Sequence, residues 1–341
     1  MNEKILVTGG SGYLGSHTTI ELQNAGYEVI IVDDLSNSSI EIINKIKKIT
    51  GVYPIFEKVD CTNLNFLEKI LKKHSEIKGL IHFAAKKNIN ESMCNPLLYY
   101  KNNLISLINI LDLMTKYDIK GIVFSSSCTI YGQPKKSPVD EMSTIQSALS
   151  PYGNTKQIGE EIIRDSIMAG APYKCIILRY FNPIGAHWSA EIGELANSNS
   201  QSLVQFIIQT AIGIRSKLFV FGNDYDTPDG SCIRDYIHVM DLAKAHVMSI
   251  KRMLDNQSDS QLEYFNLGTG NGTSVLEMIN IFEKSIGIKI PYKIVDRRKG
   301  DVDQIWANPI RANKILGWTT KEKIEDALKS AWKWQIKQKH F

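Results

Sequence analysis

The sequence predicts an α/β protein built on a doubly wound parallel sheet, with a smaller C-terminal α/β lobe. Two observations predict this fold. Through the first half of the chain, short apolar runs alternate with helical patterns, and a glycine-rich loop joins the first run to the first helical pattern. Repeated alternation of strands and helices produces a parallel sheet with helices on both faces. We expect residues 1–182 to form the domain built on this sheet and residues 183–341 to form mainly the second lobe, with some segments returning to the first domain.

The expected elements follow these patterns in order. Apolar runs predict strands at Lys4–Thr8, Glu28–Val32, Tyr53–Phe56, Gly79–Phe83, Gly121–Ser125 and Lys174–Arg179. Helices are expected from the glycine loop to Ala25 and at Ile40–Ile49, Leu64–His74, Pro96–Tyr117 and Pro151–Met168. Beyond Asn182 the alternation becomes irregular. The second lobe is expected to contain helices Leu203–Ile214, Asp241–Leu254 and Ser274–Ile286 and short strands Leu218–Phe221 and Tyr264–Asn266.

The composition is that of an ordinary globular protein. The chain has 341 residues, 43% of them apolar, and a net charge of +4 from 40 basic and 36 acidic residues. The basic residues form no long run, so the charge gives no sign of nucleic-acid binding. No apolar run reaches the roughly 18 residues of a membrane span, and the first apolar run is too short for a secretory signal. The 5 cysteines include no Cys-x-x-Cys pair, and their odd number argues against disulfides and for a reducing, cytoplasmic setting.

The glycine-rich loop predicts a nucleotide site of the Rossmann type. Gly9, Gly12 and Gly15 follow a G-x-x-G-x-x-G spacing between an expected strand and an expected helix. Glycines there let the backbone approach a pyrophosphate, which sits at the positive end of the following helix. Asp33 follows the next apolar run, 18 residues after Gly15, where a carboxylate can accept hydrogen bonds from an adenosine ribose. This acid favours NAD over NADP, because it would repel a 2′-phosphate and no arginine lies nearby to receive one.

Further polar residues close the later strands. Asp60, after the third strand, either meets the adenine edge of the nucleotide or is a simple loop acid. Small residues after the fourth strand let a cofactor pass close, and a lysine of the run that ends at Lys86 and Lys87 can reach phosphate. His82 lies inside an apolar run, and we interpret it as a packed strand histidine. The hydroxyls of Ser125–Thr129 are equally consistent with a substrate-binding group and with an ordinary polar strand end.

One helix start carries a tyrosine and a lysine in a pattern that an active site can use. Pro151 favours a helix start, and Tyr152 and Lys156, 4 residues apart, share one face of the helix. A nearby ammonium favours the phenolate. Lowering a phenol pKa from about 10 to about 7 takes roughly 4 kcal/mol, which one cation about 4 Å away supplies in a partly screened site. The same spacing occurs in many amphipathic helices, so the pair alone does not identify a site.

In this order, the glycine loop, the strand-end serines and the Tyr-x-x-x-Lys pair resemble the extended short-chain dehydrogenase/reductase superfamily, and in particular its UDP-glucose 4-epimerase family. The motifs that carry the resemblance are TGGSGYLGSH at 8–17, FSSS at 124–127, SPYG at 150–153, LRYFNP at 178–183, FGNDY at 221–225, RDYIHV at 234–239 and NLG at 266–268. The resemblance implies an isomerase of galactose metabolism that epimerises UDP-glucose and UDP-galactose at C4 through a 4-keto intermediate, with tightly bound NAD. It also implies a homodimer joined through the long helices Pro96–Tyr117 and Pro151–Met168.

The same resemblance implies the residues of the site. Tyr152 is expected to be the catalytic base, Lys156 its electrostatic partner and the anchor of the nicotinamide ribose, and Ser127 the hydroxyl beside the reacting sugar oxygen. Besides Tyr152 and Lys156, the cofactor positions are Gly9, Gly12, Tyr13, Leu14, Gly15, Asp33, Asn37, Ser38, Asp60, Cys61, Phe83, Ala84, Lys87, Asn102 and Phe181. Besides Ser127, the positions for the UDP-sugar are Asn182, Phe219, Val220, Phe221, Arg234, Arg298 and Asp301. Guanidinium forks suit phosphate oxygens, so the two arginines are expected at the diphosphate. No metal ligand is expected.

Three positions depart from the family pattern. The run 200–203 (SQSL) stands where the family usually has Pro-Asn-Asn-Leu, so at Ser202 one amide contact to the diphosphate is shortened to a hydroxyl or lost. Ile305 stands where the family gates an N-acetyl group at the C2 of the sugar, and it is neither the bulky tyrosine nor the small residue associated with the two specificities. We expect it to leave turnover of UDP-N-acetylhexosamines weak or absent. The run 85–87 (AKK) replaces the usual Gly-Leu-Lys, which keeps the final lysine.

Two other functions are consistent with parts of the sequence. A sugar-nucleotide 4,6-dehydratase or decarboxylase of the same superfamily would share the oxidation of the sugar. A dehydratase commonly has Thr-Asp-Glu where this chain has Ser-Cys-Thr at 127–129, which argues against it. A catalytically silent NAD-binding regulatory protein would be expected to have lost one of Ser127, Tyr152 and Lys156, and this chain retains all of them.

Overall fold

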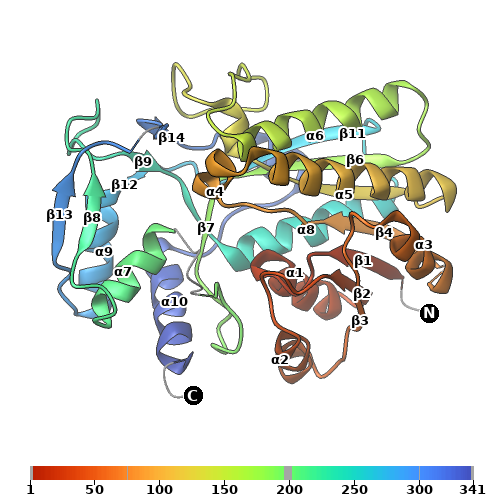
Figure 1. The fold of residues 1–341 in the computed structure, drawn as a ribbon, viewed down its shortest axis with the longest axis horizontal. Helices are drawn as coiled ribbons and strands as arrows, with labels where there is room; N and C mark the ends of the chain where they lie inside the picture. The colour runs from red at the N-terminus through yellow and green to blue at the C-terminus, as the bar shows by residue number, and fades with distance from the viewer. Residues whose placement is uncertain (1–2, 75, 196–201, 299, 339–341) are drawn as a thin grey trace.

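The structure, a computed structural model, describes residues 3–74, 76–195, 202–298 and 300–338. Its central strands are β1 (Lys4–Thr8), β2 (Glu28–Asp33), β3 (Ile55–Lys58), β4 (Ile77–His82), β5 (Gly121–Ser127), β6 (Lys174–Tyr180) and β11 (Leu262–Leu267). They form one 7-stranded parallel sheet in the order β11-β6-β5-β4-β1-β2-β3 (Figure 1). The order changes direction between β1 and β4. The predicted doubly wound sheet is confirmed.

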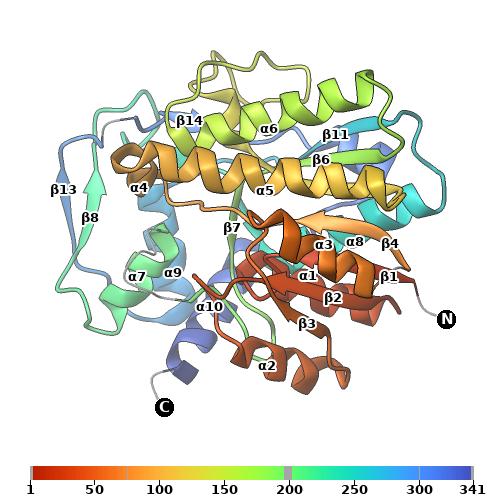
Figure 2. The same ribbon diagram turned by 45° about the vertical axis from the view of Figure 1, so that its right-hand side comes forward.

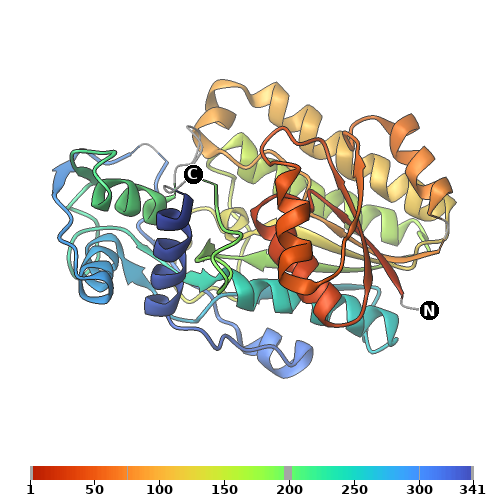
Figure 3. The ribbon, with the colours of Figure 1, turned by 90° about the horizontal axis from the view of Figure 1, so that it is seen from below.

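Helices cover both faces of this sheet. One face carries α1 (Tyr13–Asn24), α2 (Glu41–Thr50) and α8 (Val239–Leu254), and the other carries α3 (Leu64–Lys73), α5 (Pro96–Lys116) and α6 (Pro151–Met168). Figure 3, the view from below, shows the sheet between the two groups of helices. Side chains alternate along each strand, so Ile5 and Val7 of β1 pack into one core and Leu6 packs into the other. Each face of the sheet therefore has its own hydrophobic core.

Most predicted elements lie where the patterns placed them, with differences at their ends. The bounds of β1 and α6 are those predicted. β3 begins at Ile55, 2 residues later than predicted, after the exposed Tyr53 and after Pro54, which has no N–H for the strand ladder. β5 extends beyond Ser125 because the two serines that follow continue to pair with β6. This extension brings Ser127 to the carboxyl end of the strand.

Two segments that we assigned to the second lobe belong to the sheet domain, so this part of the prediction was wrong. The strand predicted at Tyr264–Asn266 is the longer β11, which pairs in parallel with β6 at the edge of the central sheet. The predicted lobe helix is α8, which packs against α1 and beneath β4 and β5. Phe265 on β11 and Ile250 on α8 are fully buried in the same core. A local pattern shows that a segment is amphipathic but not which sheet it joins.

The second lobe follows directly from β6 and lies at the left of Figure 1. Its helices are α7 (Leu203–Ala211), α9 (Val275–Ile286) and α10 (Ile324–Gln338). Its strands pair as β7 (Asn182–Ile184) with β10 (Tyr236–His238), β8 (Leu218–Phe221) with β13 (Tyr292–Val295), and β9 (Ile233–Arg234) between β12 (Thr273–Ser274) and β14 (Gln304–Ile305). The sequence did not predict several short or late elements. These are the helices α4 (Ile89–Cys94) and α10, the 3-10 turn Cys128–Tyr131, the π-helical turn Ala312–Leu316 and the short strands β7, β9, β10, β12, β13 and β14. Because β7 continues from the carboxyl end of β6, the lobe lies at the edge of the sheet where ligands bind in this architecture.

Candidate active site

The carboxyl ends of β1 and β4 lie side by side where the strand order changes direction. Nucleotides bind at this point of doubly wound sheets. The backbones approach closely here: Gly9 has a φ of +67°, and a Cβ added to it would lie 2.9 Å from the backbone nitrogen of Ala84. A Cβ on Gly15 would collide with the carbonyl oxygen of Gly9. The crevice is therefore lined by backbone, as the glycine spacing predicts.

The first turn of α1 and the carboxylate of Asp33 border this crevice. Gly12, the N-cap of α1, offers no side-chain cap, and the first turn contains no acidic residue, so the positive end of the helix has no anionic partner of its own. Asp33 Oδ2 accepts a hydrogen bond from the Ser11 N–H at 3.1 Å. Its Oδ1 accepts from the Leu35 N–H at 2.9 Å and from Ser38 Oγ at 3.0 Å. These bonds fix the carboxylate at the end of β2, where the sequence predicts a ribose contact.

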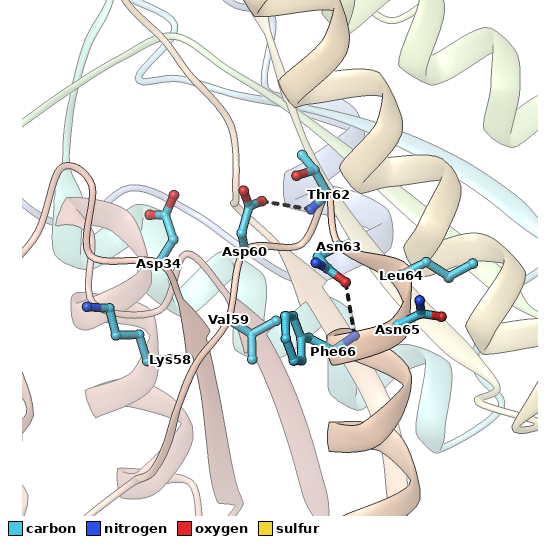
Figure 4. Close-up of a pocket in the computed structure, with 9 residues that line it drawn as sticks. All are labelled: Asp34, Lys58, Val59, Asp60, Thr62, Asn63, Leu64, Asn65 and Phe66. Carbon is cyan, nitrogen blue, oxygen red and sulfur yellow. Dashed lines mark hydrogen bonds between the residues drawn. The ribbon is translucent and has the colours of Figure 1, made fainter.

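A hollow of about 710 Å³ lies beside the carboxyl ends of β2 and β3 (Figure 4). Asp34, Lys58 and Asp60 line it together with the start of α3. Asp60 is exposed, and its Oδ1 accepts a hydrogen bond from the Thr62 N–H at 2.8 Å. Figure 4 shows the carboxylates of Asp34 and Asp60 pointing in the same direction. Cys61 is buried, and burial raises the pKa of its thiol, so this residue has no exposed thiolate to offer a ligand.

Helix α6 begins close to the carboxyl end of β5. Ser150 caps it by accepting a hydrogen bond from the Gly153 N–H at 3.1 Å. Pro151 occupies the first turn, where the missing N–H costs nothing. Tyr152 and Lys156 follow on one face of the helix, and that face turns toward the end of β5. The local sequence thus sets both the start of the helix and the direction of its functional face.

Tyr152, Lys156 and Ser127 meet at this point. Lys156 is buried, and its Nζ donates a hydrogen bond to the carbonyl oxygen of Ser125 at 2.6 Å. The same Nζ lies 6.0 Å from the centre of the Tyr152 ring. Ser127, at the end of β5, lies close enough to the Tyr152 phenol to lower its pKa. The three residues predicted to be catalytic are therefore neighbours, although they come from two separate elements.

Burial determines the charges of this group. It raises the pKa of Tyr152 to about 12, an effect that the Ser127 hydrogen bond partly offsets. It also lowers the pKa of Lys156 to about 8, and the nearby carboxylate of Glu160 opposes that change. At neutral pH the protein alone therefore holds a protonated phenol beside an ammonium group. A second positive charge brought beside the phenol by a ligand would favour the phenolate.

Asp301 holds two arginines together at the edge of the second lobe. Arg298 donates to its carboxylate from Nη2 at 2.6 Å and from Nε at 3.2 Å. Arg234 Nη2 lies 3.7 Å from the same carboxylate. The Arg298 guanidinium also lies 5.8 Å from the centre of the Phe221 ring on β8. Two guanidinium groups fixed by one carboxylate are suited to the oxygens of a diphosphate.

Asn182 and β8 contain the other predicted substrate positions. The Asn182 N–H donates to the carbonyl oxygen of Asp235 at 3.0 Å. Its side-chain Oδ1 is buried and has no hydrogen-bond partner among the described residues. On β8, Val220 is buried, whereas Phe219 is 43% exposed and available to a ligand. A buried acceptor without a partner is costly. The substrate role of Asn182 stays a prediction.

Ser202 has two partners within the protein. It is the N-cap of α7, where its Oγ accepts a hydrogen bond from the Gln205 N–H at 3.4 Å. The same hydroxyl donates to Glu194 Oε2 at 3.0 Å. An asparagine at this position would cap the helix equally well. Serine in place of asparagine therefore shortens the distance over which the side chain can reach a ligand and leaves the stability of the helix unchanged. The neighbouring Ser200 and Gln201 lie outside the described residues.

Ile305 lies on β14, where it pairs with Arg234 on β9. It is 3% exposed and packs in a small cluster with Phe181 and Cys128. Its β-branched side chain therefore packs against the 3-10 turn that follows β5. Phe181, a predicted cofactor position, is buried in the same cluster.

Lys87 connects the glycine loop to a residue that the sequence analysis did not identify. Its Nζ lies 5.7 Å from the centre of the Tyr13 ring and 3.4 Å from Glu194 Oε1. Glu194 also accepts a hydrogen bond from the Ser202 hydroxyl, so it joins a predicted cofactor position to a predicted substrate position. Lys87 and Glu194 are 107 residues apart, and no spacing pattern could have paired them.

The remaining predicted cofactor positions are less informative. Phe83 packs against His246, with ring centres 4.7 Å apart, and Leu14 packs against the core between α1 and the sheet. Asn37 is exposed, and Asn102 is half-buried on α5. No contact among the described residues ties either asparagine to the crevice. Their cofactor roles stay predictions.

Known proteins resemble this chain over its whole length. Residues 5–268 match the model described as the NAD dependent epimerase/dehydratase family. The chain is 45% identical to the UDP-glucose 4-epimerase of Bacillus subtilis (strain 168) over 331 residues, which are 97% of this chain and 96% of that protein. It belongs to the UDP-glucose 4-epimerase family.

Solved structures agree with this assignment of the epimerase-family chain. The UDP-glucose-4-epimerase of Stenotrophomonas maltophila with bound NAD and formylated UDP-arabinopyranose has a TM-score of 0.95 and 40% identity, with 99% of each chain covered. The UDP-glucose 4-epimerase of Bifidobacterium longum in complex with NAD+ and UDP has a TM-score of 0.94 and 41% identity, covering 98% of this chain and 99% of that one. The folds therefore correspond in both the sheet domain and the second lobe.

NAD is the cofactor of this epimerase-family chain, and its residues fit that molecule. The backbone of Gly9 and Ala84 leaves no room for side chains in the crevice, and the α1 N-terminus offers N–H groups to a pyrophosphate. The fixed carboxylate of Asp33 has lone pairs left for ribose hydroxyls. Within the described residues, no helix is long and apolar enough to cross a membrane. In the same residues, no group of 3 or more His, Cys, Asp and Glu side chains could hold a metal ion.

Proposed function

We propose that this protein interconverts UDP-glucose and UDP-galactose by inverting C4 of the sugar, with NAD tightly bound, as a step of galactose metabolism. The observation that carries the proposal is the meeting of Tyr152, Lys156 and Ser127 at the end of β5, beside the glycine-lined crevice. Relatives that bear the name UDP-glucose 4-epimerase over nearly the whole chain support it.

Tyr152 acts as the base in the proposed mechanism. Its phenolate takes the proton from O4 of the sugar, and the hydroxyl of Ser127, which lies beside the phenol, orients the reacting hydroxyl. Lys156 favours the phenolate because its ammonium is held beside the ring. Bound NAD supplies the hydride acceptor and donor that the reaction at C4 needs. The 4-keto sugar rotates to present its other face, and Tyr152 returns the proton to O4, so the net redox change is zero.

The rotation requires that UDP be held firmly and the sugar loosely. Arg234 and Arg298 bind the diphosphate in this proposal, and Asp301 keeps the two guanidinium groups in place. Asn182 offers its unpartnered Oδ1 to the substrate, and β8 provides the exposed Phe219 for the nucleoside. In this arrangement residues 1–182 mainly hold NAD and residues 183–341 mainly hold the UDP-sugar.

A 4,6-dehydratase or decarboxylase is the second function considered, and no specific observation favours it. A dehydratase needs an acid and a base next to the serine position. This chain has Cys128 and Thr129 there, and burial raises the pKa of the Cys128 thiol to about 12, so that thiol is not a base at neutral pH. A silent NAD-binding protein would have no need of a buried lysine held beside a tyrosine and a serine.

The proposal includes a cytoplasmic homodimer. Helices α5 and α6 lie side by side on one face of the sheet domain (Figure 2). Exposed apolar residues follow one another along α5 at Leu97, Leu98, Ile105 and Ile108. Joining two such helix pairs across a dimer interface would cover this apolar surface.

The proposed function is tested by incubating the purified protein with UDP-galactose and identifying the product by chromatography. UDP-glucose is expected. A 4-keto-6-deoxy sugar would identify a dehydratase, and the absence of any product would leave only the silent protein.

The variant Tyr152→Phe tests the role of the tyrosine. It lacks the base but keeps the ring, so it is expected to retain NAD and to lose turnover by about 10³-fold or more. Near-normal turnover by Tyr152→Phe would refute the role of the tyrosine.

A further inference from the structure

Glu160 continues the helical face that carries Tyr152 and Lys156. The three residues follow each other at intervals of 4 on α6, so each lies about one turn beyond the last. Glu160 is only 5% exposed. A carboxylate in such a position costs several kcal/mol unless it is paired. Its partners therefore show what the protein uses it for.

Glu160 is held from both neighbouring strands. Arg179 on β6 donates from Nη2 to Oε2 at 2.7 Å and from Nε to Oε1 at 3.1 Å, a bidentate pair. Ser126 on β5 donates its hydroxyl to Oε1. The side chains of Ser125 and Ser127, on either side of Ser126, face the opposite side of the strand. The Ser125 hydroxyl pairs with that of Tyr180, and it is the backbone carbonyl of Ser125 that accepts from Lys156. Three consecutive serines of β5 thus contact the residues of α6: the Ser125 carbonyl contacts Lys156, the Ser126 hydroxyl contacts Glu160, and the Ser127 hydroxyl lies beside Tyr152.

Arg179 is itself fixed on all sides. Its Nη1 donates to the Tyr131 hydroxyl at 3.1 Å and to the carbonyl oxygen of Glu141 at 3.2 Å. Its guanidinium lies 4.7 Å from the centre of the Tyr264 ring on β11. Tyr131 in turn donates to Asn266 Oδ1 at 2.7 Å. This buried network ties α6 to β5, β6 and β11, so the glutamate has little freedom to move.

Among the described residues, the charged group that affects Lys156 most directly is Glu160. From β4, His82 faces the lysine, and burial lowers the pKa of this histidine to about 3, which leaves it neutral. From β5, the lysine meets the Phe124 ring at 5.1 Å and the carbonyl oxygen of Ser125. From α6 itself, the other titratable neighbour is Tyr152.

Glu160 has two further titratable neighbours. Cys175 on β6 and Tyr264 on β11 both have pKa values that burial raises, and both are neutral at physiological pH. Arg179 is the one cation that faces the glutamate from another element within the described residues. The charged group that acts on Lys156 from the next turn of α6 is therefore the carboxylate of Glu160.

We propose that Glu160, fixed by Arg179 and Ser126, is a positioning residue that keeps the proton on Lys156 while Tyr152 is a phenolate. The inference rests on the proposed function of the site. The reactive pair of phenolate and ammonium has the same number of protons as the unreactive pair of phenol and amine. A fixed carboxylate one turn behind the lysine favours the ammonium and hence the reactive pair.

The test is the pH dependence of kcat for UDP-galactose in Glu160→Gln and in the unaltered protein. In the variant, maximal kcat is expected to fall about tenfold, the effect of one unit of relative pKa between lysine and tyrosine. Both limbs of the pH profile are expected to move to lower pH, because loss of a negative charge favours loss of protons from both groups. KM for UDP-galactose is expected to stay within about twofold, since Glu160 lies behind the lysine and away from the substrate arginines.

Two further variants keep the test decisive. Glu160→Gln leaves the buried Arg179 without a negatively charged partner, which can destabilise the fold. The double variant Glu160→Gln with Arg179→Met leaves no unpaired charge. A shift of the pH limbs in the same direction is expected from it, smaller than in Glu160→Gln because the positive charge of Arg179 is lost as well. Glu160→Asp keeps the charge and is expected to restore the original limbs.

Each outcome decides the inference. Variants that fold and lose activity without any shift of the limbs would show that the pair is only structural and would overturn it. Unchanged kcat and unchanged limbs would overturn it as well. Absence of turnover by the unaltered protein would overturn the proposed function, and the inference with it, and this result is distinguishable because it needs no variant.

Discussion

At the scale of single residues, the site depends on burial acting in opposite directions on a phenol and an amine. Burial raises the pKa of Tyr152 to about 12 and lowers that of Lys156 to about 8. Both changes favour neutral groups. The spacing of the two residues therefore places a phenol beside an amine. Further charges near them are needed to favour the phenolate, which is the form that acts as a base.

Ile305 is the residue at which substrate choice is expected to be decided. It pairs in register with Arg234 on β9, and its side chain is buried in the cluster that contains Phe181 and Cys128. A buried aliphatic side chain leaves less room for an N-acetyl group than a small residue would. We therefore expect UDP-N-acetylglucosamine to be epimerised weakly or not at all.

The prediction is checked by measuring kcat/KM for UDP-N-acetylglucosamine and UDP-glucose with the unaltered protein and with Ile305→Ala. The variant is expected to raise the relative efficiency for the N-acetyl sugar by about tenfold or more. A melting temperature for each protein controls for the cavity that the change creates. Comparable efficiencies for the two substrates in the unaltered protein would contradict the prediction.

At the scale of elements, α6 has two functions on two faces. Its inner face carries Tyr152 and Lys156, and its flank packs beside α5. The outer side of α5 exposes Leu97 and Ile105, which are 69% and 41% accessible. A helix that must hold a catalytic group still is well served by packing on every side, which a dimer interface would complete.

If two subunits are joined through these helices, negative charges placed on α5 are expected to separate them. The double variant Leu97→Asp with Ile105→Asp is expected to be a monomer at concentrations where the unaltered protein is a dimer, because burying the two carboxylates is costly. Sedimentation velocity measures both species. Ile214→Asp, a change at an apolar residue that is 65% exposed outside α5 and α6, is the matched control and should remain dimeric. A monomeric unaltered protein would contradict the proposal.

At the scale of the whole molecule, buried histidines link the fold to pH. Burial lowers the pKa of His17 and His82 to about 3 and that of His246 to about 4, from an ordinary value of 6.5. Below about pH 6.5 the unfolded chain binds protons that the folded chain does not bind. Stability from these groups is therefore complete above that pH and is lost as pH falls toward about 4.

The corresponding prediction concerns the free energy of unfolding between pH 6.5 and 5. Each such histidine is expected to contribute a loss that rises from about 0.7 kcal/mol per pH unit at pH 6.5 to about 1.3 kcal/mol per pH unit at pH 5, because the unfolded histidine is half protonated at the first pH and almost fully protonated at the second. His246→Phe removes one proton-binding group and keeps a ring against Phe83 and Tyr180, so it should reduce the slope by about that amount. Urea unfolding at several pH values measures it, and an identical slope in the variant would show that His246 is not the source.

Much of this protein was determined by its sequence alone. The glycine loop, Asp33 and the start of α6 depend on spacing within single elements, so their predicted positions agree with the structure. The doubly wound sheet followed from the repeated alternation of strands and helices. These features could be predicted because short-range sterics and hydrogen bonding fix them.

The tertiary structure decided what depends on residues far apart in the chain. It assigned α8 and β11 to the central sheet, joined Arg234 and Arg298 through Asp301, and directed the Ser202 hydroxyl to Glu194. Above all, it paired Glu160 with Arg179, one helical turn beyond Lys156. No local pattern contains these contacts, because burial and electrostatic pairing depend on which surfaces meet after the chain has folded.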